Sequence, residues 1–173
     1  MKKCLIVVDY QNDFVSGSLG FEKAKTLELG IANKINSYHV NGDDVIFTLD
    51  THYDDYMDSY EGKHLPVPHC IENTDGHKLY GSVADCVSGE DIVFRKTTFG
   101  SDALYEYLKT ACYGSVELVG VVTNICVVAN AVLAKTALPD ADIIVDNTLT
   151  ASNDERLHNA ALDTMEGMQI IIK

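Results

Sequence analysis

The sequence predicts an α/β fold, a three-layer sandwich in which helices cover both faces of a six-stranded parallel sheet. Six short apolar runs recur along the 173 residues, and most are continuous rather than alternating, as is typical of strands that are covered on both faces. Helical patterns separate several of these runs. A strand followed by a helix, repeated, implies right-handed crossovers and a doubly wound sheet. No linker or internal repeat is evident, so we expect a single domain over residues 1–173.

The strands are predicted from β-branched runs, and the helices from apolar side chains spaced four residues apart. One helical pattern covers residues 27–35 and continues to the turn at Gly42. Another follows Ser101, which we expect to cap it. An Ala-rich apolar stretch over 127–138 ends at a proline, and residues 152–155 are interpreted as a capping box before the last helix. The predicted strands are 5–8, 45–49, 92–94, 116–119, 143–145 and 170–172.

Composition excludes several classes of partner. The formal net charge of −13 argues against nucleic acid or an anionic membrane, because both need a basic face. Asp9 ends the first apolar run after five residues, and a signal peptide needs about 7–15. No run approaches the roughly 20 apolar residues of a membrane span. Five cysteines, with no export signal and no CxxC pair, indicate neither a disulfide framework nor a closed zinc–cysteine site. These features predict a cytoplasmic protein.

Ligands of open α/β sheets bind at the carboxyl ends of the strands, which defines a set of candidate residues. The side chains that follow the predicted strands are Asp9, Asp50, His52, Arg95, Lys96, the segment 120–126, Asp146 and Asn147.

Cys126 is the candidate nucleophile. It lies after the fourth strand and is predicted to open a helix, whose free N–H groups and partial positive charge lower a thiol pKa and can hold an oxyanion. Asp9 could accept the thiol proton as a general base, and Lys96 could hold Asp9 ionised or stabilise charge near the sulfur. Taken singly, each has a structural alternative: a packing cysteine, a turn aspartate and a surface lysine.

Asp50, His52, Glu61 and His69 form a candidate metal site. Asp-x-His on an extended segment can turn both side chains to one side, and carboxylate with imidazole suits zinc, iron or manganese. A solvated polar loop is the alternative. The other histidines lack this setting, and we expect His39 and His158 on helix surfaces.

Together these residues resemble the isochorismatase-like cysteine hydrolases. The matching motifs are VVDYQNDFVSGSLG at 7–20, DTH at 50–52, EGKHLPVPHCIENTDG at 61–76, FRKTTFGS at 94–101 and GVVTNICV at 120–127. They occur in the family's order over most of the chain. The resemblance implies a Rossmann-like six-stranded parallel sheet and a catalytic triad that matches Asp9, Lys96 and Cys126. It also implies a cis peptide in the segment matching Val121-Val122, with the N–H groups of Val122 and Cys126 forming the oxyanion hole.

Within this family the sequence is most similar to the nicotinamidase (pyrazinamidase) subgroup, which carries a metal that binds the pyridine nitrogen of the substrate. The implied ligands match Asp50, His52 and His69, with Glu61 as the candidate for a fourth, variable position. Phe14 matches an aromatic residue that packs on the substrate ring, and we expect Phe99 to do the same.

The implied activity is hydrolysis of nicotinamide to nicotinate and ammonia through a thioester. Zinc is the preferred metal, and iron and manganese are alternatives. Relatives are often homo-oligomers. The chain has no tryptophan, whereas many nicotinamidases place one in the ring pocket. Two alternatives stay open: a related hydrolase acting on another small amide, ureide or enol ether, and a non-catalytic binding or scaffolding protein.

Overall fold

The computed structural model describes residues 2–173 and confirms the predicted α/β sandwich. All strand pairs are parallel, and the order is β3-β2-β1-β4-β5-β6. Because the order reverses between β1 and β4, a crevice forms at the carboxyl ends of these two strands. The strands are β1 (Lys2–Val8), β2 (Asp44–Asp50), β3 (Ile92–Lys96), β4 (Tyr113–Val121), β5 (Asp142–Ala151) and β6 (Ile171–Ile172).

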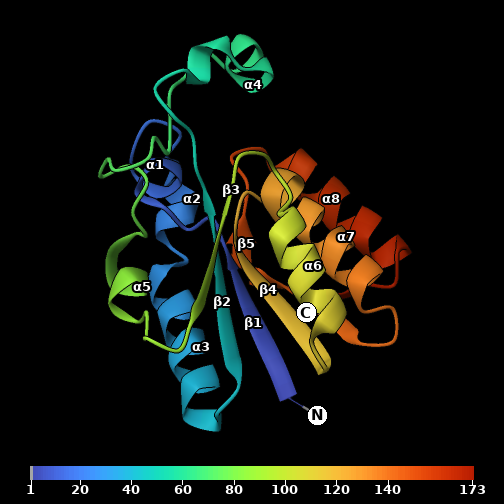
Figure 1. Ribbon diagram of the computed structural model, residues 1–173. Helices are drawn as coiled ribbons and strands as arrows, with labels where there is room; N and C mark the ends of the chain where they lie inside the picture. The colour runs from blue at the N-terminus through green and yellow to red at the C-terminus, as the bar shows by residue number, and fades with distance from the viewer. Residues whose placement is uncertain (1) are drawn as a thin grey trace.

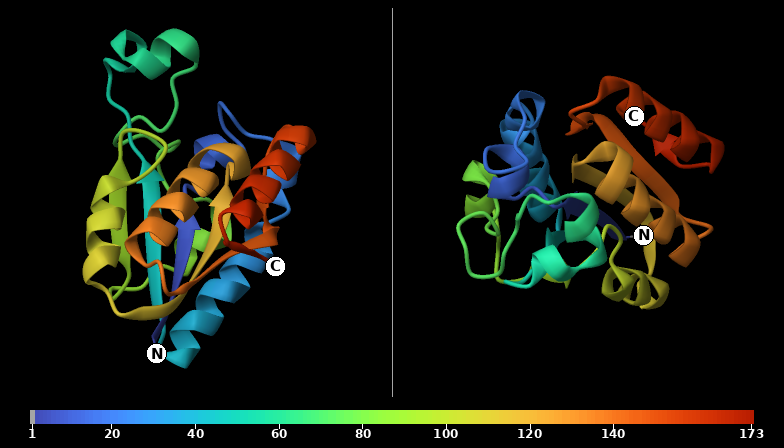
Figure 2. Two further views of the ribbon diagram at one scale, coloured as in Figure 1. Left: turned by 90° about the vertical axis from the view of Figure 1, so that its right-hand side faces the viewer. Right: turned by 90° about the horizontal axis from the view of Figure 1, so that it is seen from above.

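The helices form one layer on each face of the sheet. In Figure 1, α3 and α5 lie on one side of the strands and α6, α7 and α8 on the other, and the view from above in Figure 2 separates the same two layers. The helical segments are α1 (Asn12–Val15), α2 (Glu22–Lys25), α3 (Glu28–Asn41), η1 (Tyr56–Asp58), α4 (Tyr60–His64), α5 (Gly81–Asp85), α6 (Asp102–Thr110), η2 (Thr123–Val127), α7 (Val128–Ala137) and α8 (Glu155–Gly167).

The segment that carries η1 and α4 projects from the body of the molecule. Figures 1 and 2 show it beyond the carboxyl ends of the strands, joined to the sheet by two lengths of extended chain. No helix in residues 2–173 is both long enough and apolar enough to cross a membrane.

Two apolar clusters, one on each face, hold the layers together. Along β1, Leu5 and Val7 belong to the cluster under α3, whereas Cys4, Ile6 and Val8 belong to the cluster under α6, α7 and α8. Successive strand side chains point to opposite faces, so a fully buried strand reads as a continuous apolar run. Burying one such side chain completely contributes about 1.5–3 kcal/mol.

The helix ends follow the predicted signals in two cases. Ser101 Oγ accepts a hydrogen bond from Leu104 N at 3.1 Å and caps α6 as predicted. Gly42 ends α3 with φ +71°, a left-handed conformation that glycine adopts without steric cost.

The interpretation of residues 152–155 as a capping box is wrong. Asp154 is the N-cap of α8 and accepts a hydrogen bond from Leu157 N at 2.9 Å. Ser152 Oγ instead donates to Asn124 Oδ1 at 2.6 Å. It also accepts a hydrogen bond from Asp154 N at 3.2 Å, so Ser152 lies before the helix and Asp154 caps it.

The predicted end of the fifth strand is also wrong, because β5 continues to Ala151 after a shift in its register with β4. Asp146 and Asn147 therefore lie inside β5 and do not reach the crevice. Asp146 Oδ2 lies 2.6 Å from Lys34 Nζ, and this cation allows a carboxylate within the strand to be buried.

Candidate functional site

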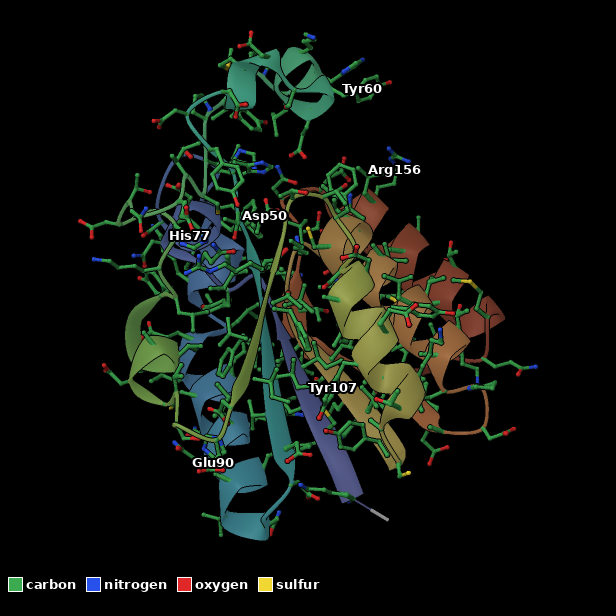
Figure 3. The ribbon with its side chains drawn as sticks, viewed as in Figure 1. Asp50, Tyr60, His77, Glu90, Tyr107 and Arg156 are labelled. Atoms are coloured by element: carbon green, nitrogen blue, oxygen red, sulfur yellow. The ribbon has the colours of Figure 1, made fainter. Side chains whose placement is uncertain are left out.

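Side chains at the carboxyl ends of four strands lie close together at one edge of the sheet. Asp9 follows β1, Asp50 ends β2, Lys96 ends β3, and η2 follows β4 with Cys126 inside it. Asp50 and Lys96 are register partners, so their side chains leave the sheet beside each other. Figure 3 shows Asp50 at this end of the sheet, beneath the projecting segment that carries Tyr60. The sheet topology thus brings together residues that are up to 117 positions apart in the chain, from Asp9 to Cys126.

Asp9, Lys96 and Cys126 form a buried cluster, each at most 5% exposed. Lys96 Nζ lies 2.6 Å from Asp9 Oδ2 and 3.7 Å from Cys126 Sγ. Thr48 Oγ1 donates to the other carboxylate oxygen of Asp9 at 2.6 Å, which leaves Oδ2 directed to the lysine. A carboxylate, an ammonium and a sulfur are therefore within reach of one small ligand.

The charges in this cluster depend on one another. Burial raises the pKa of Asp9, and the charge of Lys96 only partly offsets it. Burial by itself lowers the pKa of Lys96, but the negative charges of Asp9 and Cys126 outweigh it and the net shift is upward. Burial and then the charge of Asp9 raise the pKa of Cys126, while Lys96 opposes them. A raised carboxylate pKa makes Asp9 a stronger base, and the raised thiol pKa means that Cys126 needs one.

The turn that carries Cys126 differs in one detail from the prediction. Cys126 does not open the helix: it is the fourth residue of η2, a π-helical turn over Thr123–Val127 that continues into α7. Val122 precedes the turn in an extended conformation, and the peptide bond between Val121 and Val122 is cis, as the resemblance implies. The leading N–H groups of a helical segment lack intrahelical acceptors, so this turn can offer donors to an anion.

Asp50, His52, Glu61 and His69 converge beside this cluster, and one ligand atom from each lies within 4.8 Å of the others. His52 Nε2 and His69 Nε2 lie 3.1 and 3.4 Å from Asp50 Oδ2, and 3.9 and 3.6 Å from Glu61 Oε1. Glu61 comes from the projecting segment, so α4 completes the set. Tetrahedral zinc with bonds of about 2.1 Å places its ligand atoms about 3.4 Å apart, so these spacings fit such an ion.

The hydrogen bonds around this set favour metal binding. His69 Nδ1 lies 2.8 Å from Val67 O, which it can only approach as a donor, so Nε2 keeps its lone pair in the neutral ring. Burial opposes the ionisation of Asp50, but His52, His69 and Lys96 outweigh it and lower its pKa. The residues present therefore fit a divalent cation.

Asp50 links the two groups. Its Oδ2 faces the histidines, and its Oδ1 lies 3.2 Å from Lys96 Nζ. Sequence reasoning missed the residue that holds Asp50: buried Gln11 accepts from Asp50 N at 2.8 Å and donates to Asp50 O at 2.9 Å. Gln11 also donates to His77 O at 2.8 Å. The sequence signal that could have indicated this role is the position of Gln11, two residues after Asp9.

A cavity of about 210 Å³ is lined by Cys126 and by Asp50, Glu61 and His69 of the metal set. It is below the roughly 300–1,000 Å³ of drug-sized sites, so it suits a small ligand. Phe14 is buried in its wall, with its ring centroid 5.4 Å from that of His69, whereas Phe99 is 47% exposed at the rim. Val122, predicted for the oxyanion hole, also lines the cavity, and sequence reasoning missed the rest of the wall, which includes Leu19, Phe21, Leu65, Ile125 and Asn153.

The prediction that His158 lies on a helix surface is wrong, because the side chain is only 4% exposed. It lies on the inner face of α8, where Thr123 and Asn147 are its hydrogen-bonding partners. His39 is partly exposed and pairs with Asp91 at 2.8 Å.

Comparisons with known proteins agree with this geometry. A family model described as an isochorismatase domain matches residues 3–172. An uncharacterised isochorismatase family protein, PncA of Bacillus subtilis strain 168, is 34% identical, over 94% of this chain and 93% of that protein. The crystal structure of nicotinamidase PncA from Bacillus subtilis superposes with a TM-score of 0.87 at 29% identity, covering 99% of both chains.

The pyrazinamidase of Pyrococcus horikoshii, crystallised in complex with zinc, has the same fold, with a TM-score of 0.87 at 23% identity over 100% of this chain and 99% of that one. Because the family model covers nearly the whole sequence and the ordered motifs meet at one crevice, the chain belongs to the isochorismatase family.

Proposed function

We propose that this protein is a metal-containing cysteine amidohydrolase that converts nicotinamide to nicotinate and ammonia through a thioester intermediate. One observation carries the proposal: Cys126, which is joined to Asp9 through Lys96, lines the same small cavity as three members of the metal set. A ring held against Phe14 presents its carboxamide to the sulfur.

In the first half-reaction, Asp9 Oδ2 accepts the proton of Cys126 Sγ, and the sulfur attacks the carboxamide carbon. The N–H groups of Val122 and Cys126 stabilise the oxyanion of the tetrahedral intermediate. When the C–N bond breaks, Asp9 returns the proton to nitrogen and ammonia leaves. Lys96, between Asp9 and the sulfur, stabilises the negative charge that moves between them.

In the second half-reaction, Asp9 accepts a proton from water, and the oxygen attacks the thioester carbon. The C–S bond breaks, the proton returns to the sulfur, and nicotinate leaves. The chain's residues return to their starting protonation states, and the acid loses its remaining proton to ammonia in solution. The net reaction is therefore amide plus water giving carboxylate and ammonium.

Asp50, His52, Glu61 and His69 would hold the metal, with zinc preferred and iron or manganese as alternatives. The metal supplies an open coordination position for the pyridine nitrogen. The donor set supports this assignment because it mixes nitrogen and oxygen atoms, as catalytic and substrate-holding sites do.

In this role the chain would return nicotinamide to pyridine nucleotide synthesis in the cytoplasm, within NAD salvage. We also retain homo-oligomerisation as a prediction, which size-exclusion chromatography with light scattering would measure.

Ammonia release from nicotinamide by purified protein tests the proposal, with and without a chelator. Cys126→Ala should abolish turnover while the melting temperature and zinc content stay at wild-type values. Cys112→Ala is the matched control, because this exposed thiol lies outside the cavity and its loss should leave turnover unchanged. Substantial ammonia release by Cys126→Ala would rule out the nucleophile.

The substrate is tested separately from the mechanism. Pyrazinamide, an N-carbamoyl compound and isochorismate are assayed beside nicotinamide. If the N-carbamoyl compound or isochorismate has a higher kcat/KM than nicotinamide, the protein catalyses that family reaction and the nicotinamidase assignment is wrong. Added hydroxylamine should divert the thioester to nicotinohydroxamate, and its absence during active turnover would contradict the covalent intermediate.

A further inference from the structure

The turn that carries Cys126 is held by side chains from α8 and β5. Its first residue, Thr123, has its Oγ1 2.9 Å from Nδ1 of His158 on α8. His158 Nε2 lies 3.1 Å from Asn147 Oδ1 on β5. His158 thus joins α8 and β5 to the start of η2, and neither the family motifs nor the proposed mechanism assigns it a role.

The partners of His158 define its hydrogen atoms. Asn147 presents a carboxamide oxygen, which only accepts, so the hydrogen of the imidazole is on Nε2. Nδ1 then has a lone pair, and the hydroxyl of Thr123 donates to it. Burial lowers the pKa of His158 and the charge of Lys23 acts in the same direction, against Glu155, which favours the neutral ring that this arrangement needs.

Thr123 directly follows Val122 and begins the turn that ends one residue after Cys126. Thr123 is fully buried, so its hydroxyl has few other partners. If the bond to His158 is lost, the hydroxyl must rotate to another acceptor or remain unpaired, and the start of the turn is released.

We propose that His158 is a positioning residue for the nucleophile turn: through Thr123 it holds the backbone N–H groups of Val122 and Cys126 where the oxyanion forms. The inference rests on the proposed function, because it assigns those groups to the oxyanion hole. His158 lies behind the turn, not among the residues that line the cavity, and it does not touch the substrate.

A residue that acts in this way affects the transition state more than the bound substrate. The oxyanion forms only after attack, so a displaced turn lowers kcat while Phe14 and the metal set still bind the ring. His158→Leu should lower kcat about 10–100-fold and leave KM within about twofold of wild type, since small displacements of reacting groups have effects of this size. Zinc content should not change.

Four further variants separate positioning from stability. Thr123→Val removes the hydroxyl but keeps the branched shape, and it should reproduce the loss of kcat. The double variant His158→Leu/Thr123→Val should be no slower than the slower single variant, because both remove one interaction. His158→Gln, which keeps a donor and an acceptor, should restore much of the rate. Met165→Ala removes a fully buried side chain two turns further along α8 and is the control for stability.

Hydrogen exchange of the peptide over residues 120–128 gives a readout that needs no substrate. His158→Leu and Thr123→Val should exchange faster there than wild type and Met165→Ala. If the wild-type protein has no nicotinamidase activity, the proposed function is refuted, but the hydrogen-exchange comparison still tests whether His158 holds the turn. Wild-type exchange in His158→Leu, a kcat no lower than that of Met165→Ala, or a rise in KM without a fall in kcat would each overturn the positioning role.

Discussion

Lys34→Met should destabilise the fold more than any other single replacement of an exposed or partly exposed lysine. Lys34 lies on α3, and its Nζ lies 2.5 Å from Glu117 Oε1 and 2.6 Å from Asp146 Oδ2. The Lys34 side chain is 15% exposed, and the two carboxylates are 6% and 8% exposed. The substitution keeps most of the apolar stem but removes the charge between two buried anions.

The magnitude follows from what remains around those anions. Removing one partner of a buried ion pair costs about 3–5 kcal/mol, because the other charge stays buried and uncompensated. Tyr38 still donates to Glu117 at 2.7 Å, Lys173 Nζ still lies 3.3 Å from Glu117 Oε1, and Thr148 still donates twice to Asp146. We therefore expect Lys34→Met to lower the free energy of unfolding by about 3 kcal/mol at pH 7, the lower end of this range. For a chain of this length that corresponds to a fall in Tm of about 6–12 °C.

The loss should depend on pH. Burial opposes the ionisation of Glu117 and Asp146, but Lys34 and their hydrogen bonds outweigh it and lower both pKa values. A carboxyl group whose folded pKa is lowered stabilises the fold above its unfolded pKa, and that stability is lost as the pH falls through the folded pKa. Without Lys34 the buried carboxyls take up protons readily, so the difference between variant and wild type should shrink from pH 7 toward about pH 4.

Urea unfolding followed by circular dichroism at pH 7 and pH 4 measures both effects. Lys25→Met is the matched control: its Nζ also lies 2.6 Å from a carboxylate, that of Glu22, but the side chains are 42% and 90% exposed. Its free energy of unfolding should not differ measurably from that of wild type, because an exposed ion pair contributes little. A similar small change for Lys34→Met at pH 7, or an equal loss at both pH values, would refute the reasoning.

Three further predictions concern the site. Asp9→Asn removes the general base, so kcat for ammonia release should fall by about 10²–10⁴ with KM nearly unchanged; retained kcat would place the base elsewhere. Glu61→Ala removes one donor from the metal set, and competition with a chromophoric chelator should show zinc affinity weakened by more than roughly 10-fold, whereas wild-type affinity would exclude Glu61 as a ligand. Gly120 has φ +111°, and an added Cβ would lie 2.1 Å from Val8 O. Gly120→Ala should therefore lower the free energy of unfolding by more than about 3 kcal/mol, which differential scanning calorimetry would detect, and a near-wild-type Tm would contradict the close approach of β1 and β4.

Several features of the site could be predicted from the sequence because the signals are local. Asp9, Asp50 and Lys96 each follow an apolar strand, and parallel strands place their carboxyl ends at one edge of a sheet. Knowing the strand ends was therefore enough to predict that these side chains are neighbours. The order of the family motifs favoured the catalytic and metal-binding roles over the structural alternatives for Cys126 and for the metal set, and these roles remain predictions for the assays above.

Other features could not be read from the sequence, because the partner of a polar residue decides where it lies. Asp50 and Asp146 both follow apolar runs, yet Asp50 ends its strand at the cavity while Asp146 lies within β5 against Lys34. The sequence around His158 predicts a position on a helix surface. The side chain is nevertheless buried, because Thr123 and Asn147 provide hydrogen-bonding partners for both ring nitrogens.

The sequence alone determined the layers of this fold, its six strands, its four longest helices, and the edge of the sheet where the candidate catalytic residues lie. Apolar periodicity and chain order carry that information, and both are properties of short stretches. The tertiary structure decided the extent of β5, the hydrogen bonds by which Gln11 holds Asp50, and the burial of His158. Each of these depends on hydrogen bonds and charges supplied from distant parts of the chain, since a buried polar group is stable only when such a partner is present.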